Sequence, residues 1–215
     1  MSRRDHPLFA RYYARVSRLM EREVAAYRRV LLNDLSGRVI EIGAGNGLNF
    51  PHYPATVAEV VAVEPEAYLR RIAENTIVRA AVPITVVDGL AEALPAADGS
   101  CDAAVASFVL CTAADPERAL AEVFRVLRPG GQLRFFEHVQ ADTPGRRRIQ
   151  RALDATVLPF LLGGCHCGRD TTRTIERAGF VIERLDRLGT TDTGIPFPTA
   201  PQVLGTATRP GSRHP

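Results

Sequence analysis

The chain has 215 residues, of which 46% are hydrophobic, so its size and composition favour one domain with one substantial core. All 27 basic residues are arginine, the net charge is +3 and there is no long basic block, so no nucleic-acid partner is expected. Four cysteines without a repeated pair pattern argue against a disulfide scaffold, and the first residues lack the apolar segment of a signal peptide or membrane anchor. We therefore expect a cytoplasmic protein.

The N-terminal region carries apolar side chains at helical intervals over residues 8–32, which predicts one or two amphipathic helices. We expect residues 1–36 to form a helical cap on the domain that follows. Tyr12 and Tyr13 are interpreted as packing residues of this cap, with a lid over a binding pocket as the alternative.

A buried strand followed by a glycine-rich turn is predicted where residues 39–47 read V-I-E-I-G-A-G-N-G. Glycine lacks a Cβ, so Gly43, Gly45 and Gly47 can take positive φ and let the main chain approach a ligand closely. Leu48 stands where the dinucleotide-binding pattern G-x-G-x-x-G needs its last glycine, which disfavours a dinucleotide oxidoreductase. No G-K-S/T follows, so a P-loop is excluded as well.

The next predicted strand, residues 58–63, delivers Glu64 to its carboxyl end, just before Pro65. A carboxylate at this position can accept hydrogen bonds from both hydroxyls of a ribose. Glu41, at the end of the first strand, can meet an ammonium group as a charge-assisted pair. A ligand with a ribose, an amine and no phosphate indicates S-adenosylmethionine.

Strands and helices alternate along the rest of the chain. Further strands are predicted over residues 103–110, 132–137, 181–188 and 202–208. Helices are predicted over residues 68–79, over 116–127 with Asp115 as N-cap and an end at 129–131, and over 171–178 with a stop at Gly179. Such alternation predicts a parallel sheet with helices on both faces and a ligand crevice at the carboxyl ends of the strands. We expect residues 209–215 to form a disordered tail.

The chain resembles the class I S-adenosylmethionine-dependent methyltransferases of the branch known as methyltransferase domain type 11. The strings that carry this resemblance, over residues 38–134, are E-I-G-A-G-N-G, V-A-V-E-P-E, D-G-L-A-E-A-L-P-A-A-D-G-S-C-D and A-E-V-F-R-V-L-R-P-G-G-Q-L. Four more resemble the narrower group that includes thiol S-methyltransferases: L-N-F-P-H-Y-P, F-V-L-C-T, F-F-E-H-V and G-C-H-C-G-R-D-T. The resemblance implies a Rossmann-like, seven-stranded, mostly parallel sheet with an antiparallel last strand, and a methyltransferase domain over residues 37–208.

The resemblance also implies which residues contact S-adenosylmethionine. The methionine part is lined by Glu41, Gly43, Ala44, Gly45 and Gly47, and the ribose is held by Glu64 and Pro65. Leu90 and Ala91 lie at the adenine, where Leu90 replaces the acid usual in the family and Asp88 is the alternative partner of the amino group. Ser107 and Phe108 lie near the sulfonium.

Few protein groups are needed for the transfer itself, because the sulfonium brings its own leaving group. His138, just past the strand over residues 132–137, is the candidate general base, with a pocket-wall histidine as the alternative. His52 and Tyr53 are interpreted as stabilising the glycine turn, with a place at the methionine end as the alternative.

The segment Cys165-His166-Cys167 contains residue types that bind zinc, but no further ligand pair stands at a known spacing. Cys101 and Cys111 are ten residues apart and near a predicted buried strand, and Cys111 is interpreted as an inert core thiol. No metal is therefore expected. We interpret this segment as a wall of the acceptor pocket, with Arg169 as an anion contact.

An arginine group at residues 146–151 precedes the apolar residues 157–162. It is interpreted as a solvated helix face, with contact to a membrane surface or an acidic lipid as the alternative. Together these inferences predict an S-adenosylmethionine-dependent methyltransferase for a small-molecule nucleophile, with a thiol favoured. The alternatives are a lipid, quinone-like or amine methyltransferase, and a non-catalytic S-adenosylmethionine-binding protein.

Overall fold

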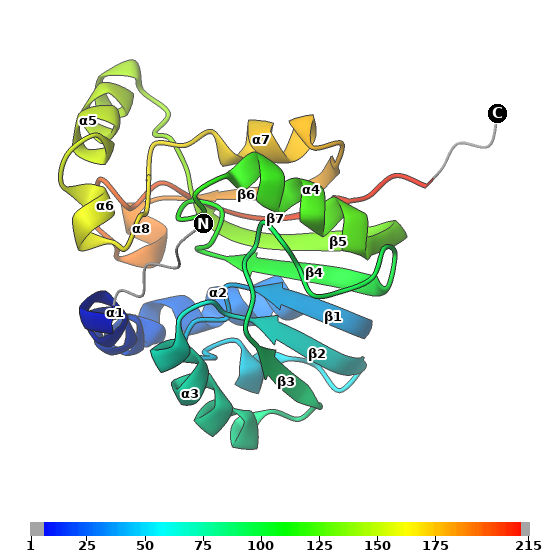
Figure 1. Ribbon diagram of the computed structural model, residues 1–215. Helices are drawn as coiled ribbons and strands as arrows, with labels where there is room; N and C mark the ends of the chain where they lie inside the picture. Colours follow the sequence, from blue (N-terminus) through cyan, green and yellow to red (C-terminus); the bar gives the residue numbers. More distant parts are fainter. Residues whose placement is uncertain (1–6, 212–215) are drawn as a thin grey trace.

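The computed structural model describes residues 7–211, which build one seven-stranded sheet with helices on both faces (Figure 1). The strand order is β3-β2-β1-β4-β5-β7-β6. The strands are β1 Gly37–Ile42, β2 Val57–Val63, β3 Ile84–Val87, β4 Cys101–Ser107, β5 Leu127–His138, β6 Val181–Leu188 and β7 Gln202–Thr208. The first five pair in parallel, and β7 runs antiparallel to both of its neighbours, which confirms the predicted fold class.

The helices cover the two faces of this sheet. They are α1 Pro7–Leu19, α2 Glu21–Leu32, α3 Ala67–Thr76, α4 Pro116–Val126, α5 Pro144–Asp154, α6 Leu158–Leu161, α7 Thr171–Arg177 and α8 Thr190–Thr193, with the 3-10 turns η1 Phe50–His52 and η2 Ile77–Arg79. The central strands are apolar on both sides, as expected where helices cover both faces. In β4, for example, Ala104 packs with α4 and α7, and Val105 packs with α2.

The predicted N-terminal helical region forms two helices, α1 and α2, which meet at Met20. α2 packs against the sheet through Val24, Leu31 and Leu32. α1 packs instead against α3, where Ala10 and Ala14 meet Leu69. α1 also lies beside the carboxyl end of β1, because its Tyr13 ring is close to Gly45 in the turn that follows this strand.

Two predicted boundaries in the middle of the chain are wrong. β4 was expected to reach Leu110 but ends at Ser107, because Phe108 takes a φ of 58° and turns the chain away. α4, capped by Asp115 as predicted, ends at Val126, and β5 begins at the next residue. Residues 129–131 therefore lie inside β5 but do not pair with β4, whose partners pass from Leu127 directly to Gln132. They are held instead by Arg209, which accepts the Gly130 amide at 2.8 Å and donates to the Gly131 carbonyl at 2.9 Å.

The C-terminal part follows the prediction for β6 and β7, and α7 ends before Gly179, whose φ is 94°. The predicted disordered tail begins too early. The Arg209 amide donates to the Gly131 carbonyl at 2.9 Å, and its guanidinium lies 4.6 Å from the centre of the Phe124 ring. Residues 212–215 of that predicted tail lie outside the described residues.

α5 carries the arginine group, and α6 follows it with apolar side chains at the surface: Phe160 is 87% exposed and Leu161 58%. Figure 1 shows both helices at one end of the molecule. Within residues 7–211, no helix combines the length and the apolar character needed to cross a membrane.

Candidate functional site

The predicted site residues gather at one edge of the sheet because parallel strands end on the same side. Gly43 follows β1, Glu64 follows β2, Leu90 is the third residue after β3, and Ser107 and His138 are the last residues of β4 and β5. This edge, formed by five strand ends, is where the sequence predicts a ligand crevice, and we refer to it below as the crevice.

The glycine turn after β1 takes the backbone conformation that the sequence predicted. The φ values of Gly43, Gly45 and Gly47 are 62°, 56° and 75°. A Cβ built on Gly43 would lie 1.9 Å from Cγ2 of Val109, so this backbone is packed too closely for any side chain. The Ala44 amide donates to the Val63 carbonyl at 3.0 Å and ties the turn to β2.

Glu64 lies at the end of β2 with its carboxylate directed at this turn. One oxygen accepts the Gly45 amide at 2.8 Å and the other accepts the Glu66 amide at 2.9 Å. Glu64 is 5% exposed, and burial raises its pKa above the ordinary value. Each carboxylate oxygen has two lone pairs, so each retains one acceptor position after binding its amide. A pair of acceptors on one rigid carboxylate fits a ribose diol.

The neighbourhood expected to bind adenine contains an arginine that the sequence interpretation missed. Arg70 donates to the carbonyls of Glu64 and Pro65 and pairs with Asp88 at 3.1 Å. It thereby joins the ends of β2 and β3. Asp88, the alternative partner of an adenine amino group, is thus engaged with this guanidinium, whereas Leu90 is 44% exposed.

Glu41 is buried in β1, and both of its oxygens accept hydrogen bonds. Asn49 donates to one oxygen and the Tyr53 hydroxyl to the other, each at 2.8 Å. Burial raises the pKa of Glu41 to about 7, and these two hydrogen bonds oppose the rise. Tyr53 therefore turns inward to Glu41, whereas Nε2 of His52 lies 3.6 Å from a carboxylate oxygen of Glu21.

Arg28 extends this network and was not found from the sequence. It reaches from α2 to Asn49 at 2.8 Å and to the Ser107 hydroxyl at 3.3 Å. It is 7% exposed although it is charged. A sequence signal was present: Arg28 stands four residues after Val24 and three before Leu31, on the apolar face of an amphipathic helix.

The raised pKa of Glu41 predicts that the stability of the protein depends on pH. The variant Glu41→Gln, which has no carboxyl group at this position, should show a weaker dependence. A carboxyl with a folded pKa of about 7 and an ordinary value of 4.5 binds its proton more tightly when folded. Its contribution is therefore present below the unfolded value and lost as pH rises through about 7. We expect the wild type to lose on the order of 2 kcal/mol of unfolding free energy between about pH 5 and about pH 8.5. Urea unfolding at both pH values measures this loss, and an equal loss in the variant would contradict the assignment.

Tyr13 places α1 over the crevice. A Cβ built on Gly45 would lie 3.3 Å from the Tyr13 ring, so the ring covers the turn. Burial raises the pKa of Tyr13 to about 12, with Glu64, Cys111 and Glu41 among the charged or ionisable groups that act on its hydroxyl. Tyr12, by contrast, is 51% exposed. Of the two tyrosines, Tyr13 is the one that lies against the glycine turn, and it also packs with Ala10, Ala14 and Leu69.

Aromatic side chains form the wall of the crevice between β4 and β5. The Phe108 ring centre lies 4.4 Å from that of Phe136 and 4.7 Å from that of His138. A non-glycine residue with positive φ is uncommon, and such strain concentrates at functional sites. The conformation of Phe108 is stabilised by the three residues that follow it, because the Glu137 carboxylate accepts the amides of Val109, Leu110 and Cys111 at 2.8, 2.9 and 3.1 Å.

His138 faces two cysteine sulfurs. Its Nδ1 lies 3.4 Å from Sγ of Cys111 and 3.4 Å from Sγ of Cys165, and Cys165 lies 3.6 Å from Cys167. Burial lowers the pKa of His138 to about 4, so the ring is neutral near pH 7. The proximity of these four residues could not be predicted from the sequence, because they come from three separate segments of the chain. Arg169 donates to the carbonyls of Leu110 and Ala113 and so anchors the loop that carries Cys165.

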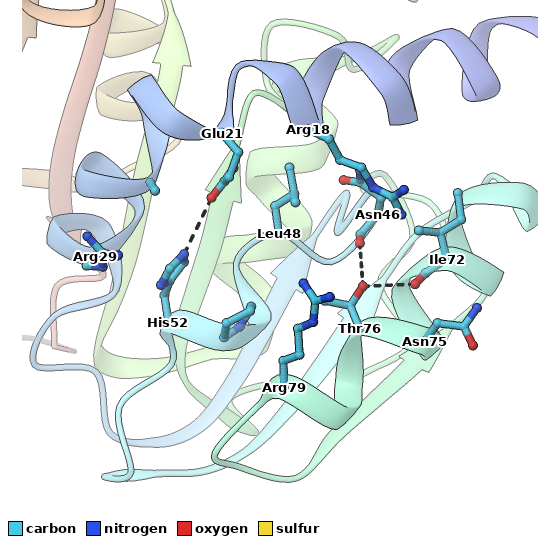
Figure 2. Close-up of a pocket in the computed structure, with 12 residues that line it drawn as sticks. Arg18, Glu21, Arg29, Asn46, Leu48, His52, Ile72, Asn75, Thr76 and Arg79 are labelled. Carbon is cyan, nitrogen blue, oxygen red and sulfur yellow. Dashed lines mark hydrogen bonds and ion pairs between the residues drawn. The ribbon is translucent and has the colours of Figure 1, made fainter.

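A cavity of about 710 Å³ lies beside the glycine turn, where Asn46 and Leu48 are among the residues that line it (Figure 2). It opens between α1, α2 and α3. Its lining residues are Arg18, Glu21, Ala25, Arg29, Asn46, Leu48, Pro51, His52, Ile72, Asn75, Thr76 and Arg79. Three arginines against one carboxylate repel a sulfonium cation, so this cavity does not suit the donor expected at the crevice.

Comparison with known proteins gives a consistent result. Residues 40–135 match the family model described as a methyltransferase domain. The thiol S-methyltransferase TMT1B of Mus musculus is 37% identical over 188 residues, which cover 83% of this chain and 74% of that protein. The thiol S-methyltransferase TMT1A of Homo sapiens is 32% identical over 193 residues, which cover 84% of this chain and 78% of that protein.

Solved structures share the fold. One is an S-adenosylmethionine-dependent methyltransferase of Thermotoga maritima, described as a possible histamine N-methyltransferase. It superimposes with a TM-score of 0.68 at 23% identity, over 94% of this chain and 97% of that chain.

Proposed function

Because the chain belongs to the S-adenosylmethionine-dependent methyltransferases, we propose that this enzyme methylates the sulfur of a small-molecule thiol. The observation that carries the choice of acceptor is the similarity to thiol S-methyltransferases over most of this chain. The chemistry agrees with it. A thiol has a pKa of about 8.5, so a modest fraction is already thiolate at neutral pH, whereas an amine or aliphatic hydroxyl asks more of the site.

We assign the donor to the crevice. Glu64 and Pro65 would hold the ribose, Ala44 and the three glycines would line the methionine part, and Leu90 and Ala91 would flank the adenine. Glu41 would accept the ammonium group, since each of its oxygens retains an acceptor position beyond Asn49 and Tyr53. Ser107 and Phe108 would lie near the sulfonium.

The two parts of the chain would then have different tasks. Residues 37–208 would carry the donor-binding residues, and residues 7–36 of the predicted cap would close the acceptor side, where Tyr13 lies against the glycine turn and would help to exclude water. Residues 1–6 of the predicted cap lie outside the described residues. The bound donor supplies both the methyl group and its own leaving group, so the protein mainly orients the acceptor sulfur.

His138 is our candidate for the group that takes the proton of the thiol. Its neutral ring has a lone pair available near pH 7, because burial lowers its pKa to about 4. Nδ1 faces the cysteine sulfurs, so the proton would be taken by Nε2. The low pKa also means that the protonated ring passes the proton to solvent readily.

The test is methyl transfer from labelled S-adenosylmethionine to matched acceptors. Thiophenol and phenol have the same shape, and so do an alkyl thiol and its alcohol, so each pair isolates the acceptor atom. We expect each thiol to react at least about tenfold faster, in kcat/KM, than its oxygen counterpart. Faster transfer to a quinone-like phenol, a lipid or an amine would replace the thiol. Tight donor binding without transfer to any acceptor would indicate a non-catalytic binding protein.

A further inference from the structure

We propose that Cys111, His138 and Cys165 form a binding site for a zinc ion at the edge of the crevice. Their ligand atoms, two Sγ and Nδ1, all lie within 4.8 Å of one another. Thiolate sulfur and imidazole nitrogen are the ligands that zinc prefers. Two cysteines and one histidine are also sufficient for a site with three protein ligands.

The spacing of the three atoms suits a tetrahedral ion. Bonds of about 2.3 Å to sulfur and about 2.0–2.1 Å to nitrogen, at tetrahedral angles, place sulfur and nitrogen about 3.6 Å apart. Both sulfur–nitrogen distances here are 3.4 Å. The two sulfurs lie within 4.8 Å of each other, against about 3.8 Å around a tetrahedral zinc, so an ion between the three atoms requires side-chain shifts of at most about 1 Å.

The backbone holds these side chains from three separate segments. Glu137 fixes the segment before Cys111 through its three amide contacts. The His166 amide donates to the Cys111 carbonyl at 2.8 Å and ties the Cys165 loop to that segment. Thr171 donates to the His138 carbonyl at 3.2 Å and ties the end of β5 to the same loop. The ligands are thus positioned in advance, as a precise metal site requires.

Charge balance favours a dication here. Cys111 and Cys165 are 0% and 2% exposed, and as thiolates they would neutralise the two charges of zinc, their protons passing to solvent. The neighbouring carboxylate, Glu137, accepts three backbone amides and also a hydrogen bond from the Cys111 thiol, a bond that would be lost when this thiol gives up its proton to bind the ion. The Cys167 sulfur lies 3.6 Å from that of Cys165 but outside the three-atom group, which leaves a fourth coordination position for water or an external thiol.

The spacing of residues along the chain predicted no metal, because a C-H-C segment alone lacks further ligands. The fold supplies Cys111 and His138 to Cys165, whereas Cys101 lies elsewhere in the core and His166 contributes only its backbone. A bound ion would make His138 a ligand rather than a base, and its charge would lower the pKa of a thiol in the fourth position. That last consequence rests on the proposed function, but the metal site does not.

The test measures metal rather than methyl transfer. The full-length chain is produced in medium containing zinc sulfate, purified without chelator and analysed by inductively coupled plasma mass spectrometry. We expect about one zinc per chain in the wild type and in Cys101→Ser, and below about 0.1 in Cys111→Ser and Cys165→Ser. Cys101→Ser is the matched control because Cys101 is also a buried cysteine.

Two further measurements guard against a variant that simply unfolds. Wild-type protein with Co²⁺ in place of zinc should show the visible bands of four-coordinate cobalt and sulfur-to-cobalt charge transfer. His138→Gln, which keeps a neutral polar side chain, should weaken zinc binding about 100-fold or more against a chromogenic chelator. Folded wild-type protein that binds neither ion would overturn the proposal. So would unchanged affinity in His138→Gln, or a Cys111–Cys165 disulfide in freshly purified protein.

Discussion

Replacing Glu64 with alanine is expected to weaken S-adenosylmethionine binding by about 1 to 3 kcal/mol, a roughly 5- to 150-fold rise in Kd. The carboxylate is buried, and its two remaining acceptor positions are the ones assigned to the ribose. Removing it also leaves the Gly45 amide without its acceptor, so the turn loses a fixed point. Isothermal titration with the donor and with its demethylated product measures the effect.

Glu59→Ala is the matched control. Glu59 lies on the same strand, β2, but its side chain is 50% exposed and pairs with Arg38 at the surface. Such an exposed pair contributes little to stability, so the control should bind the donor as the wild type does. Thermal unfolding separates a lost ribose contact from a loosened fold. Unchanged affinity in a folded Glu64→Ala protein would show that the ribose is bound elsewhere.

The strand-and-helix pattern of the core could be predicted because local signals and tertiary packing agree there. The apolar run before Gly43 becomes β1, and Asp115 caps α4 as its side chain allows. The boundaries failed where the two disagree. Residues 129–131 favour a turn locally and do not pair with β4, yet β5 runs through them because Leu127 pairs with Cys101 and the two glycines bond to Arg209.

The candidate site could be predicted from the sequence in part: the residues at strand ends were found, and those that reach the site from other elements were not. Residues that follow strand ends, such as Glu64, are placed by topology, so their position follows from the sheet. Arg28 reaches the site from α2, outside the sheet. Its role depends on its contact with Asn49, and the position of Asn49 is set by the path of the glycine turn. The group around His138 depends on the path of a loop, which local spacing does not encode.

Gly43→Ala is expected to have the second large effect, on both folding and donor binding. A Cβ in the left-handed region costs about 1–2 kcal/mol, and overpacking adds about 1–3 kcal/mol, so we expect a loss of roughly 2–5 kcal/mol in unfolding free energy. The overpacking arises because the new methyl would lie 1.9 Å from Cγ2 of Val109. Urea unfolding measures the loss. Gly145→Ala is the control, because a Cβ there meets nothing within 4 Å and Gly145 lies in α5, so the substitution should leave stability unchanged or raise it slightly.

The double variant Gly43→Ala/Val109→Ala separates the two causes. Val109→Ala removes the clashing methyl groups but leaves the φ of 62° at position 43 unchanged. The pair should therefore show a favourable coupling of about 1 kcal/mol or more in a double-mutant cycle, with the backbone strain still present. Donor binding should stay weak in the double variant, because the turn, not Val109, is assigned to the methionine part. Additive losses would mean that Val109 moves aside easily, and restored binding would mean that the turn itself is not the contact.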